Sequence, residues 1–284
     1  MPIDFTIKIY SKLLKALKEV DYSFQTYYNF TTQPKEKTII LRHDVDARKD
    51  HSLQFAKIQH EMGIVGTYYF RMVPQSFDKE VIREIAAMGH EIGYHYEDMD
   101  FAKGDVDKAY ELAKKHLAQL REVAVIKTIC MHGSPRSPYD NKEVWKKYDY
   151  RALGIIAEPY FDLDFSKILY LTDTGRRWDG DKVSIRDKIP ASDSGTSTVN
   201  KYQKAAIDGN KPKASDGITL SNKYRFHTTQ DIIEACKAGR LPNQIMMNFH
   251  PQRWTDNPVL WTRELVLQNL KNLVKRGIIR YRTR

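Results

Sequence analysis

Short apolar runs alternate with amphipathic stretches along most of the 284-residue chain, and this alternation limits the possible folds more than any other feature. Residues 38–41 form an apolar, β-branched run, which is typical of a buried strand. Residues 52–62 then repeat apolar side chains at helical spacing and end before Gly63. The same order recurs without internal sequence repeats. We therefore expect an α/β fold with a parallel sheet.

The same patterns predict the remaining elements. Further strands are predicted at residues 64–70, 90–95, 126–131, 153–157, 168–172, 244–249 and 278–282. Further helices are predicted at residues 4–20, 78–88, 106–123, 141–147, 229–238 and 260–275. In the first of these helices a lysine stripe lies opposite the apolar face. Such a stripe can mark a membrane-surface helix, but it is more often the solvated side of a packed helix, which we favour.

Two stretches depart from the alternation. Residues 1–37 are expected to form an N-terminal helical extension. Residues 190–222 are rich in Ser, Thr, Asp, Gly and Lys and contain few large apolar residues. They predict a long polar loop insertion that is weakly ordered in part. The piece that follows is too small for a separate domain, so residues 1–284 are expected to form a single domain.

Composition narrows the range of partners. The sequence has 46 Lys+Arg against 36 Asp+Glu, a net charge of +10, which favours anionic partners such as acidic sugars or lipid surfaces. No nucleic-acid-binding module is recognisable, so nucleic acid is not expected. Cys130 and Cys236 are far apart and predict reduced, buried thiols. Without a signal-peptide pattern or a long apolar run, we expect no transmembrane segment and a cytoplasmic location. The sequence does not indicate an oligomeric state.

Polar clusters follow four of the predicted strands. They are His43-Asp44-Val45-Asp46, His95-Tyr96-Glu97-Asp98, His132 to Arg136, and His250-Pro251. A lone histidine at a strand end is usually structural, but in a barrel the carboxyl ends of all strands converge on one face. Asp44 and Asp46 stand two residues apart and point the same way in an extended segment. One could bind a metal while the other acts as a base; capping of the next helix is the structural alternative.

These motifs resemble those of the NodB-like polysaccharide deacetylases, carbohydrate esterase family 4. RHDVD at 42–46 is similar to the family's aspartate pair, and GHEIGYH at 89–95 to its histidine motif. RSPY at 136–139 and MMNFHP at 246–251 are similar to its arginine-proline motif and its late histidine strand. The resemblance implies a distorted (β/α) barrel of the NodB type as a single domain. Two positions differ: Met99 replaces the family's second metal histidine, and Asp140 replaces a glycine.

The resemblance implies hydrolysis of an N-acetyl or O-acetyl group on a sugar or polysaccharide precursor, by water bound to a divalent metal, expected to be zinc. Asp44 is the expected base and His250 the expected acid. Asp46 and His95 are expected metal ligands. Glu97 is chosen as the third, because a thioether such as Met99 is a poor zinc ligand and Glu97 alternates with His95 along the chain.

The remaining expected site residues contact the substrate. They are Arg42, His43, His132, Arg136, Trp178 and Trp254. Arg42 or Arg136 is also expected to keep Asp44 ionised. The loop from Asp173 to Trp178 is matched loosely to the family's aspartate-tryptophan element. Structural alternatives are a turn role for His132, a core role for Trp254 and a cation–π cluster for Trp178.

Two other functions are compatible with the sequence. A metal-independent amidohydrolase acting on a small cyclic amide or ureide is favoured by the methionine at position 99. A non-catalytic carbohydrate-binding protein is the other, although the presence of both Asp44 and His250 argues against it.

Overall fold

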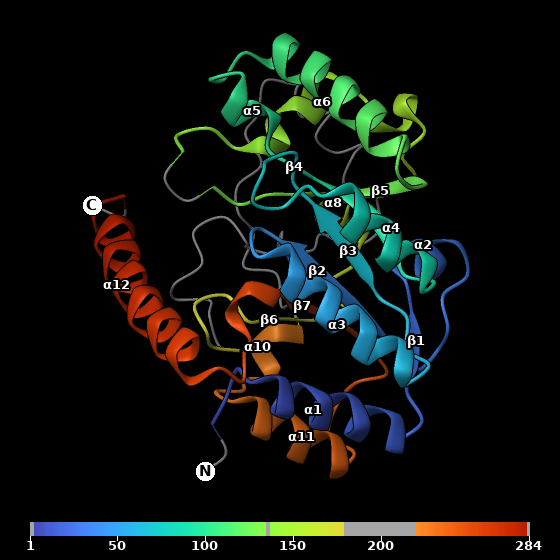
Figure 1. Ribbon diagram of the computed structural model, residues 1–284, viewed down its shortest axis with the longest axis vertical. Helices are drawn as coiled ribbons and strands as arrows, with labels where there is room; N and C mark the ends of the chain where they lie inside the picture. The colour runs from blue at the N-terminus through green and yellow to red at the C-terminus, as the bar shows by residue number, and fades with distance from the viewer. Residues whose placement is uncertain (1–2, 135–136, 179–219, 283–284) are drawn as a thin grey trace.

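A parallel β-sheet forms the centre of the computed structural model, which describes residues 3–134, 137–178 and 220–282 (Figure 1). The hydrogen-bonded order is β5-β4-β3-β2-β7-β6, and β1 pairs with the first half of β2. The strands are β1 (Ser23–Gln25), β2 (Thr38–Val45), β3 (Thr67–Phe70), β4 (Glu91–Tyr96), β5 (Ile126–Met131), β6 (Leu169–Thr172) and β7 (Gln244–Phe249). Every pairing between named strands is parallel.

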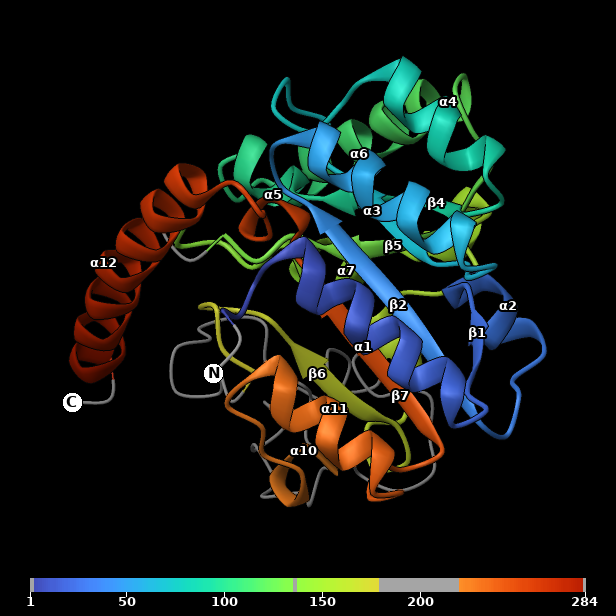
Figure 2. The same ribbon diagram turned by 60° about the horizontal axis from the view of Figure 1, so that its bottom comes forward.

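Helices and short helical turns connect the strands and cover the sheet. They are α1 (Ile7–Glu19), α2 (Tyr27–Thr32), α3 (Lys49–Glu61), α4 (Lys79–Ala87), α5 (Asp98–Phe101), α6 (Val106–Arg121), η1 (Asn141–Glu143), α7 (Val144–Lys147), η2 (Tyr150–Leu153), α8 (Pro159–Asp162), α10 (Leu220–Lys223), α11 (Thr229–Lys237), η4 (Pro251–Arg253) and α12 (Pro258–Arg282). Figures 1 and 2 show α1 and α11 side by side beneath the sheet.

Strand β2 is the central strand. All eight of its residues are buried, and it pairs with β3 on one side and β7 on the other. Beyond the edge strand β5, Ala157 forms a bridge with Thr128. The Tyr160 hydroxyl in α8 then reaches Arg42 Nη2 in β2 at 3.2 Å, so this segment lies over the interior of the curved sheet. The fold is a single α/β domain with the arrangement of a distorted (β/α) barrel, as expected.

Most of the described segment before β2, residues 3–30, contributes to this core. The predicted apolar face of α1 is buried, with Tyr10, Leu13, Leu14 and Leu17 fully covered, while its lysines are exposed. Residues 23–25 add β1 to the sheet. The segment therefore contributes to the core rather than standing apart from it.

Several element boundaries differ from the predicted ones. The predicted strand at 278–282 is wrong, because these residues continue helix α12. A single glycine, Gly277, costs a helix about 1 kcal/mol, which is too little to end one of this length. Residues 153–157 contribute only the bridge at Ala157. Most of the predicted polar loop at 190–222 lies outside the described residues. In the described part of the chain, no helix has the length and apolar character needed to span a membrane.

Candidate active site

Polar side chains from four parallel strands meet at the carboxyl edge of the sheet. β2 carries Asp44, and Asp46 follows directly after it; His95 lies in β4, and His132 and His250 follow β5 and β7. Parallel pairing aligns these strand ends, because Asp44 pairs with Tyr69 in β3 and His95 pairs with Cys130 in β5. The fold therefore brings together the residues expected to form the base, the acid and two metal ligands.

Three of these side chains form a compact triangle. Asp46 Oδ1 lies 3.2 Å from His132 Nδ1 and 3.5 Å from His95 Nε2. His132 Nδ1 and His95 Nε2 are 3.2 Å apart. Ligands of a tetrahedral zinc ion, bound at about 2.0–2.1 Å, lie about 3.3 Å from one another. The three atoms therefore have the spacing of ligands around one tetrahedral ion.

Two of the three atoms, His95 Nε2 and Asp46 Oδ1, face the centre of this triangle with lone pairs. His95 Nδ1 donates to the Cys130 carbonyl at 2.9 Å, which leaves Nε2 unprotonated in the neutral ring. Asp46 Oδ1 is buried and has no hydrogen-bond partner among the described residues. Burial opposes ionisation of Asp46, but His132 holds its pKa well below the usual range. Buried acceptors that face one another are costly without a cation or a proton between them, so this set fits a divalent metal.

A second set of possible ligands shares His95. Asp44, His95 and Cys130 also offer donor atoms within 4.8 Å of one another. Asp44, however, already accepts two hydrogen bonds from Arg42, at 2.9 and 2.7 Å, and one from Asn248 at 3.1 Å. The oxygens of Asp44 already accept hydrogen bonds, whereas Asp46 Oδ1 accepts none among the described residues. Asp46, His95 and His132 are therefore the better set of metal ligands.

Glu97 was expected as the third ligand, and the structure differs. Arg71 binds both of its carboxylate oxygens, at 2.8 and 2.6 Å, and Glu97 Oε2 lies 3.9 Å from His132 Nε2. β4 ends at Tyr96 and α5 follows at once, so the extended backbone assumed for Glu97 does not persist. His132, which was expected to line the sugar site, lies at the third corner of the triangle instead. Glu97 lies on the other side of the His132 ring, near Nε2. Met99 is buried in the core.

Arg42 fixes the expected base. Burial opposes ionisation of Asp44, but the Arg42 guanidinium and His95 hold the pKa of this carboxyl below its usual range. Arg42 is only 1% exposed and also bonds to the Tyr160 hydroxyl at 3.2 Å. Arg42 therefore stabilises the ionised form of Asp44 from within the core. Because it is buried, it is not placed to contact a substrate, which corrects its expected role.

His250 is oriented by a buried carboxylate. Its Nδ1 donates to Asp173 Oδ1 at 2.6 Å, and its Nε2 lies 4.0 Å from Asp44 Oδ2. Asp173 also accepts from Arg253 Nη1 at 2.8 Å and from Trp254 Nε1 at 2.7 Å. Burial opposes ionisation of Asp173, but His250 and Arg253 lower its pKa. Sequence reasoning did not assign this role to Asp173, although the residue directly follows strand β6.

Three further residues expected to contact substrate belong to the core. His43 alternates with Arg42 and Asp44 along β2, so it points to the opposite face, where it stacks on Tyr68 at 4.1 Å. Trp254 is fully buried and bonds to Asp173, in agreement with the core alternative. Trp178 is buried and donates to Thr229 Oγ1 at 2.9 Å. Arg136 lies outside the described residues.

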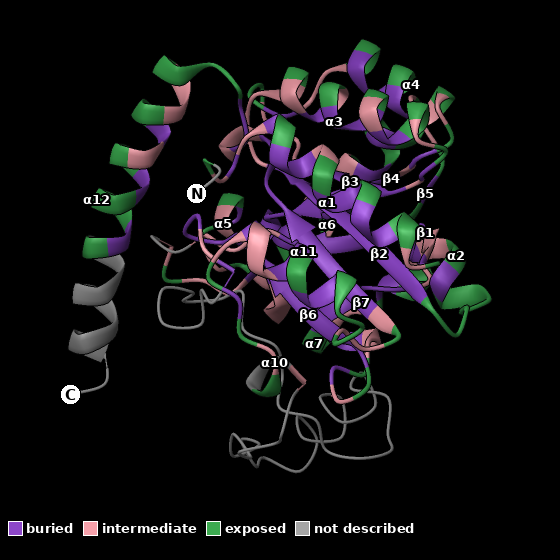
Figure 3. Cartoon of the chain, turned by 90° about the horizontal axis from the view of Figure 1, so that it is seen from below, coloured by how far each residue is buried: buried purple, intermediate pink, exposed green. Residues whose placement is uncertain are grey.

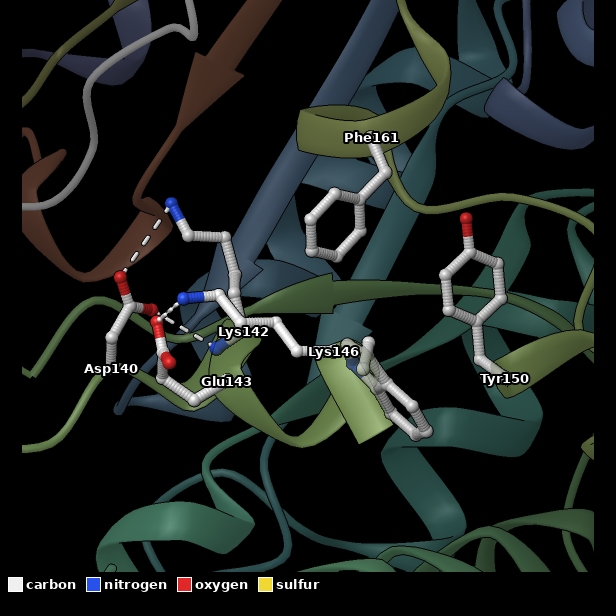
Figure 4. Close-up of a pocket in the computed structure, with 7 residues that line it drawn as sticks. Asp140, Lys142, Glu143, Lys146, Tyr150 and Phe161 are labelled. Carbon is white, nitrogen blue, oxygen red and sulfur yellow. Dashed lines mark hydrogen bonds and ion pairs between the residues drawn. The ribbon is translucent and has the colours of Figure 1, made fainter. Parts of the chain in front are cut away.

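Figure 4 shows a pocket of about 160 Å³, whose lining residue Lys142 also contacts the ring of Tyr160, the partner of Arg42. Its lining includes aromatic and charged side chains: Asp140, Lys142, Glu143, Trp145, Lys146, Tyr150 and Phe161. Lys142 Nζ lies 5.3 Å from the centre of the Tyr160 ring and 3.8 Å from Asp140 Oδ2. Asp140, which replaces the family's glycine, is thus paired with a lysine at this pocket.

Comparison with known proteins gives little further information. No protein-family model matches the chain, and no curated protein matches it. Among solved structures, a family 4 carbohydrate esterase from Bacillus anthracis is similar over 83% of this chain and 97% of that chain, with 14% sequence identity and a TM-score of 0.34. Similarity at this level carries no argument about activity.

Proposed function

We propose that the protein is a metal-dependent hydrolase that removes an N-acetyl or O-acetyl group from a sugar or polysaccharide precursor. The observation that carries this proposal is the triangle of Asp46, His95 and His132 beside Asp44 and His250. Two imidazole nitrogens and one carboxylate oxygen, with a position left for water or substrate, are a typical ligand set of catalytic zinc. Zinc is therefore the ion we expect.

The metal would polarise the acetyl carbonyl and make a bound water more acidic. Asp44 is the base in this scheme. Because Arg42 keeps its pKa low, Asp44 is ionised at neutral pH and can accept the proton of the attacking water. The bonds from Arg42 and Asn248 also fix the direction of its carboxylate.

His250 is the acid. Its Nδ1 is held by Asp173, so Nε2 is the atom directed towards Asp44 and Asp46, at 4.0 and 3.9 Å. From this position a protonated His250 can donate to the leaving amine or alkoxide on the other side of the reacting carbon. The carboxylate and the imidazole thus divide base and acid work in the way usual for such pairs.

The excess of basic residues supports an anionic form of the sugar as substrate. A nucleotide sugar and a lipid-linked saccharide both carry phosphate groups. Acetylated sugar precursors that carry phosphate groups are therefore the first class of substrate to test.

The experiment measures acetate release from N-acetylated and O-acetylated sugars, each as the free sugar, the nucleotide sugar and the oligomer. Protein stripped of metal by a chelator is compared with protein restored with zinc. We expect release only with metal present. An Asp44→Asn variant is the matched control, because it should keep the metal and lose the activity. Full activity in metal-free protein would support the metal-independent amidohydrolase, and metal-loaded protein that binds sugars without releasing acetate would support the binding protein.

A further inference from the structure

Helix α12 presents a row of large apolar side chains to solvent. Val259 is 73% exposed, Val266 53%, Leu270 57% and Leu273 68%. At about 100° per residue, these four positions fall within one narrow stripe along the helix. Figure 3 shows α12 beside the main body of the protein, with exposed residues along its described turns. We call these four residues the apolar stripe.

The side of α12 opposite the apolar stripe is polar and buried. Glu264, Gln268 and Asn272 follow one another at intervals of four residues, and all three are buried. Gln268 donates to Asn272 Oδ1 at 3.0 Å, and Asn272 donates to the Gly175 carbonyl at 3.0 Å. A helix at a protein surface normally buries its apolar side. α12 buries Trp261 only in part and leaves the apolar stripe exposed, so the stripe is suited to a partner outside this chain.

The stripe also borders an open groove. A space of about 750 Å³ lies between α12 and the loop that follows β6, and Val266, Leu270 and Leu273 line it together with residues 175–177. A row of exposed apolar side chains rimmed by polar residues is typical of sites that bind a protein or a membrane.

Charge decides between these partners. Residues 258–282 contain six basic residues (Arg263, Lys271, Lys275, Arg276, Arg280 and Arg282) and one acid, Glu264. Arg263 and Lys271 are exposed, whereas the acid is buried. Two copies of this helix packed through their stripes would bring like charges together. An anionic lipid surface accepts both the apolar stripe and the surrounding cations.

We propose that α12 binds the surface of an anionic membrane, with the apolar stripe at the level of the upper acyl chains and the exposed Arg263 and Lys271 among the headgroups. The helix lies in the plane of the interface and does not cross it. This inference does not depend on the hydrolase activity, because none of the proposed catalytic or metal-binding residues belongs to α12.

The experiment is co-sedimentation of the full-length protein with vesicles of phosphatidylcholine, with and without phosphatidylglycerol. We expect binding to the anionic vesicles only, and weaker binding as salt is added. The double variant Leu270→Glu/Leu273→Glu should lower the affinity by at least about 10-fold, because it places two charges in the apolar stripe. Lys271→Glu should reduce the preference for phosphatidylglycerol.

Val125→Glu is the matched control, since Val125 is 75% exposed and lies before β5, away from α12. It should bind like the unaltered protein. All the variants change exposed residues, so each should keep its melting temperature. Equal binding to both vesicle types, or no binding to either, would overturn the proposal. A dimer that dissociates in the double variant would also overturn it, in favour of a second copy as the partner.

Discussion

Two partly buried carboxylates at opposite ends of the parallel strands have opposite surroundings. Glu91, at the start of β4, accepts hydrogen bonds from the Thr67 hydroxyl at 2.8 Å, the Tyr28 backbone N–H at 2.9 Å and the Thr128 hydroxyl. Asp46, just after β2, directs Oδ1 at two imidazole nitrogens, and no described residue forms a hydrogen bond with that atom. Side chains and backbone of the protein supply hydrogen bonds to Glu91. Asp46 Oδ1 has the surroundings expected of an atom that binds a metal ion.

The contrast matches the general division of work in barrels, in which one edge stabilises the fold and the carboxyl edge carries the chemistry. Glu91 links β3, β4, β5 and the start of α2, so its bonds hold structure together. A buried polar atom without a partner has a cost, and it is kept where binding or catalysis needs it. For this pair of carboxylates, the difference in hydrogen-bond partners separates the structural Glu91 from Asp46, the proposed metal ligand.

Replacing Asp46 tests the contrast most strongly. Asp46→Ala should reduce bound metal to background and acetate release by about 10³-fold or more, since Lewis-acid assistance is worth several kcal/mol. Metal content by elemental analysis and the rate of acetate release are the measurements. Unchanged metal in the purified variant would show that Asp46 is not a ligand.

The proton-transfer residues should respond differently. Asp44→Asn and His250→Ala should each lower the rate by about 10²–10⁴-fold, the usual worth of general acid–base catalysis, while metal content stays constant. If either variant lost its metal as well, the proposed separation between metal-binding and proton-transfer residues would be wrong.

The structural carboxylate should affect stability instead. Glu91→Ala leaves two hydroxyls and a backbone N–H without their acceptor, so the free energy of unfolding should fall by about 2–4 kcal/mol. In metal-free protein Asp46→Ala should cost less, because it removes only the bond that Asp46 Oδ2 accepts from Gln252 Nε2 at 3.0 Å, and Oδ1 accepts none among the described residues. Urea unfolding of both metal-free variants gives the comparison, and equal losses would contradict it.

Glu97 offers the finest test. Held by Arg71 and close to His132 Nε2, it is placed to orient this ligand. Glu97→Gln should weaken metal affinity by about 10–100-fold, the range for residues that support a ligand. Asp98→Asn is the control, because Asp98 bonds to Tyr94 and His116 instead. A chelator competition assay measures both, and equal affinities would exclude a role for Glu97.

Local patterns predicted what depends on local chemistry. The strands at 126–131 and 244–249 have the predicted bounds, since each is a short, mainly apolar run between polar stretches. The rule that the carboxyl ends of parallel strands converge correctly predicted that Asp44, Asp46, His95 and His250 lie close together.

Long-range pairing could not be read in the same way. Choosing His132 over Glu97 as the third ligand would have required knowing that Arg71 pairs with Glu97, which no sequence spacing reveals. His43 precedes Asp44 in the same motif. Because side chains alternate along a strand, His43 points into the core on the opposite face, so its expected role as a substrate contact was wrong.

The pairing of β2 with β7 sets an order in which the molecule can be assembled. Thr38 in β2 pairs with Gln244 in β7, so one edge of the central strand has no neighbour until nearly the whole chain has left the ribosome. The three proposed metal ligands precede that point, whereas Asn248 and His250 come with the last strand. A growing chain could thus acquire its metal before it acquires its acid. Pulse-labelled hydrogen exchange on stalled chains should show β2 amides on the β7 side becoming protected only after residue 249 has emerged.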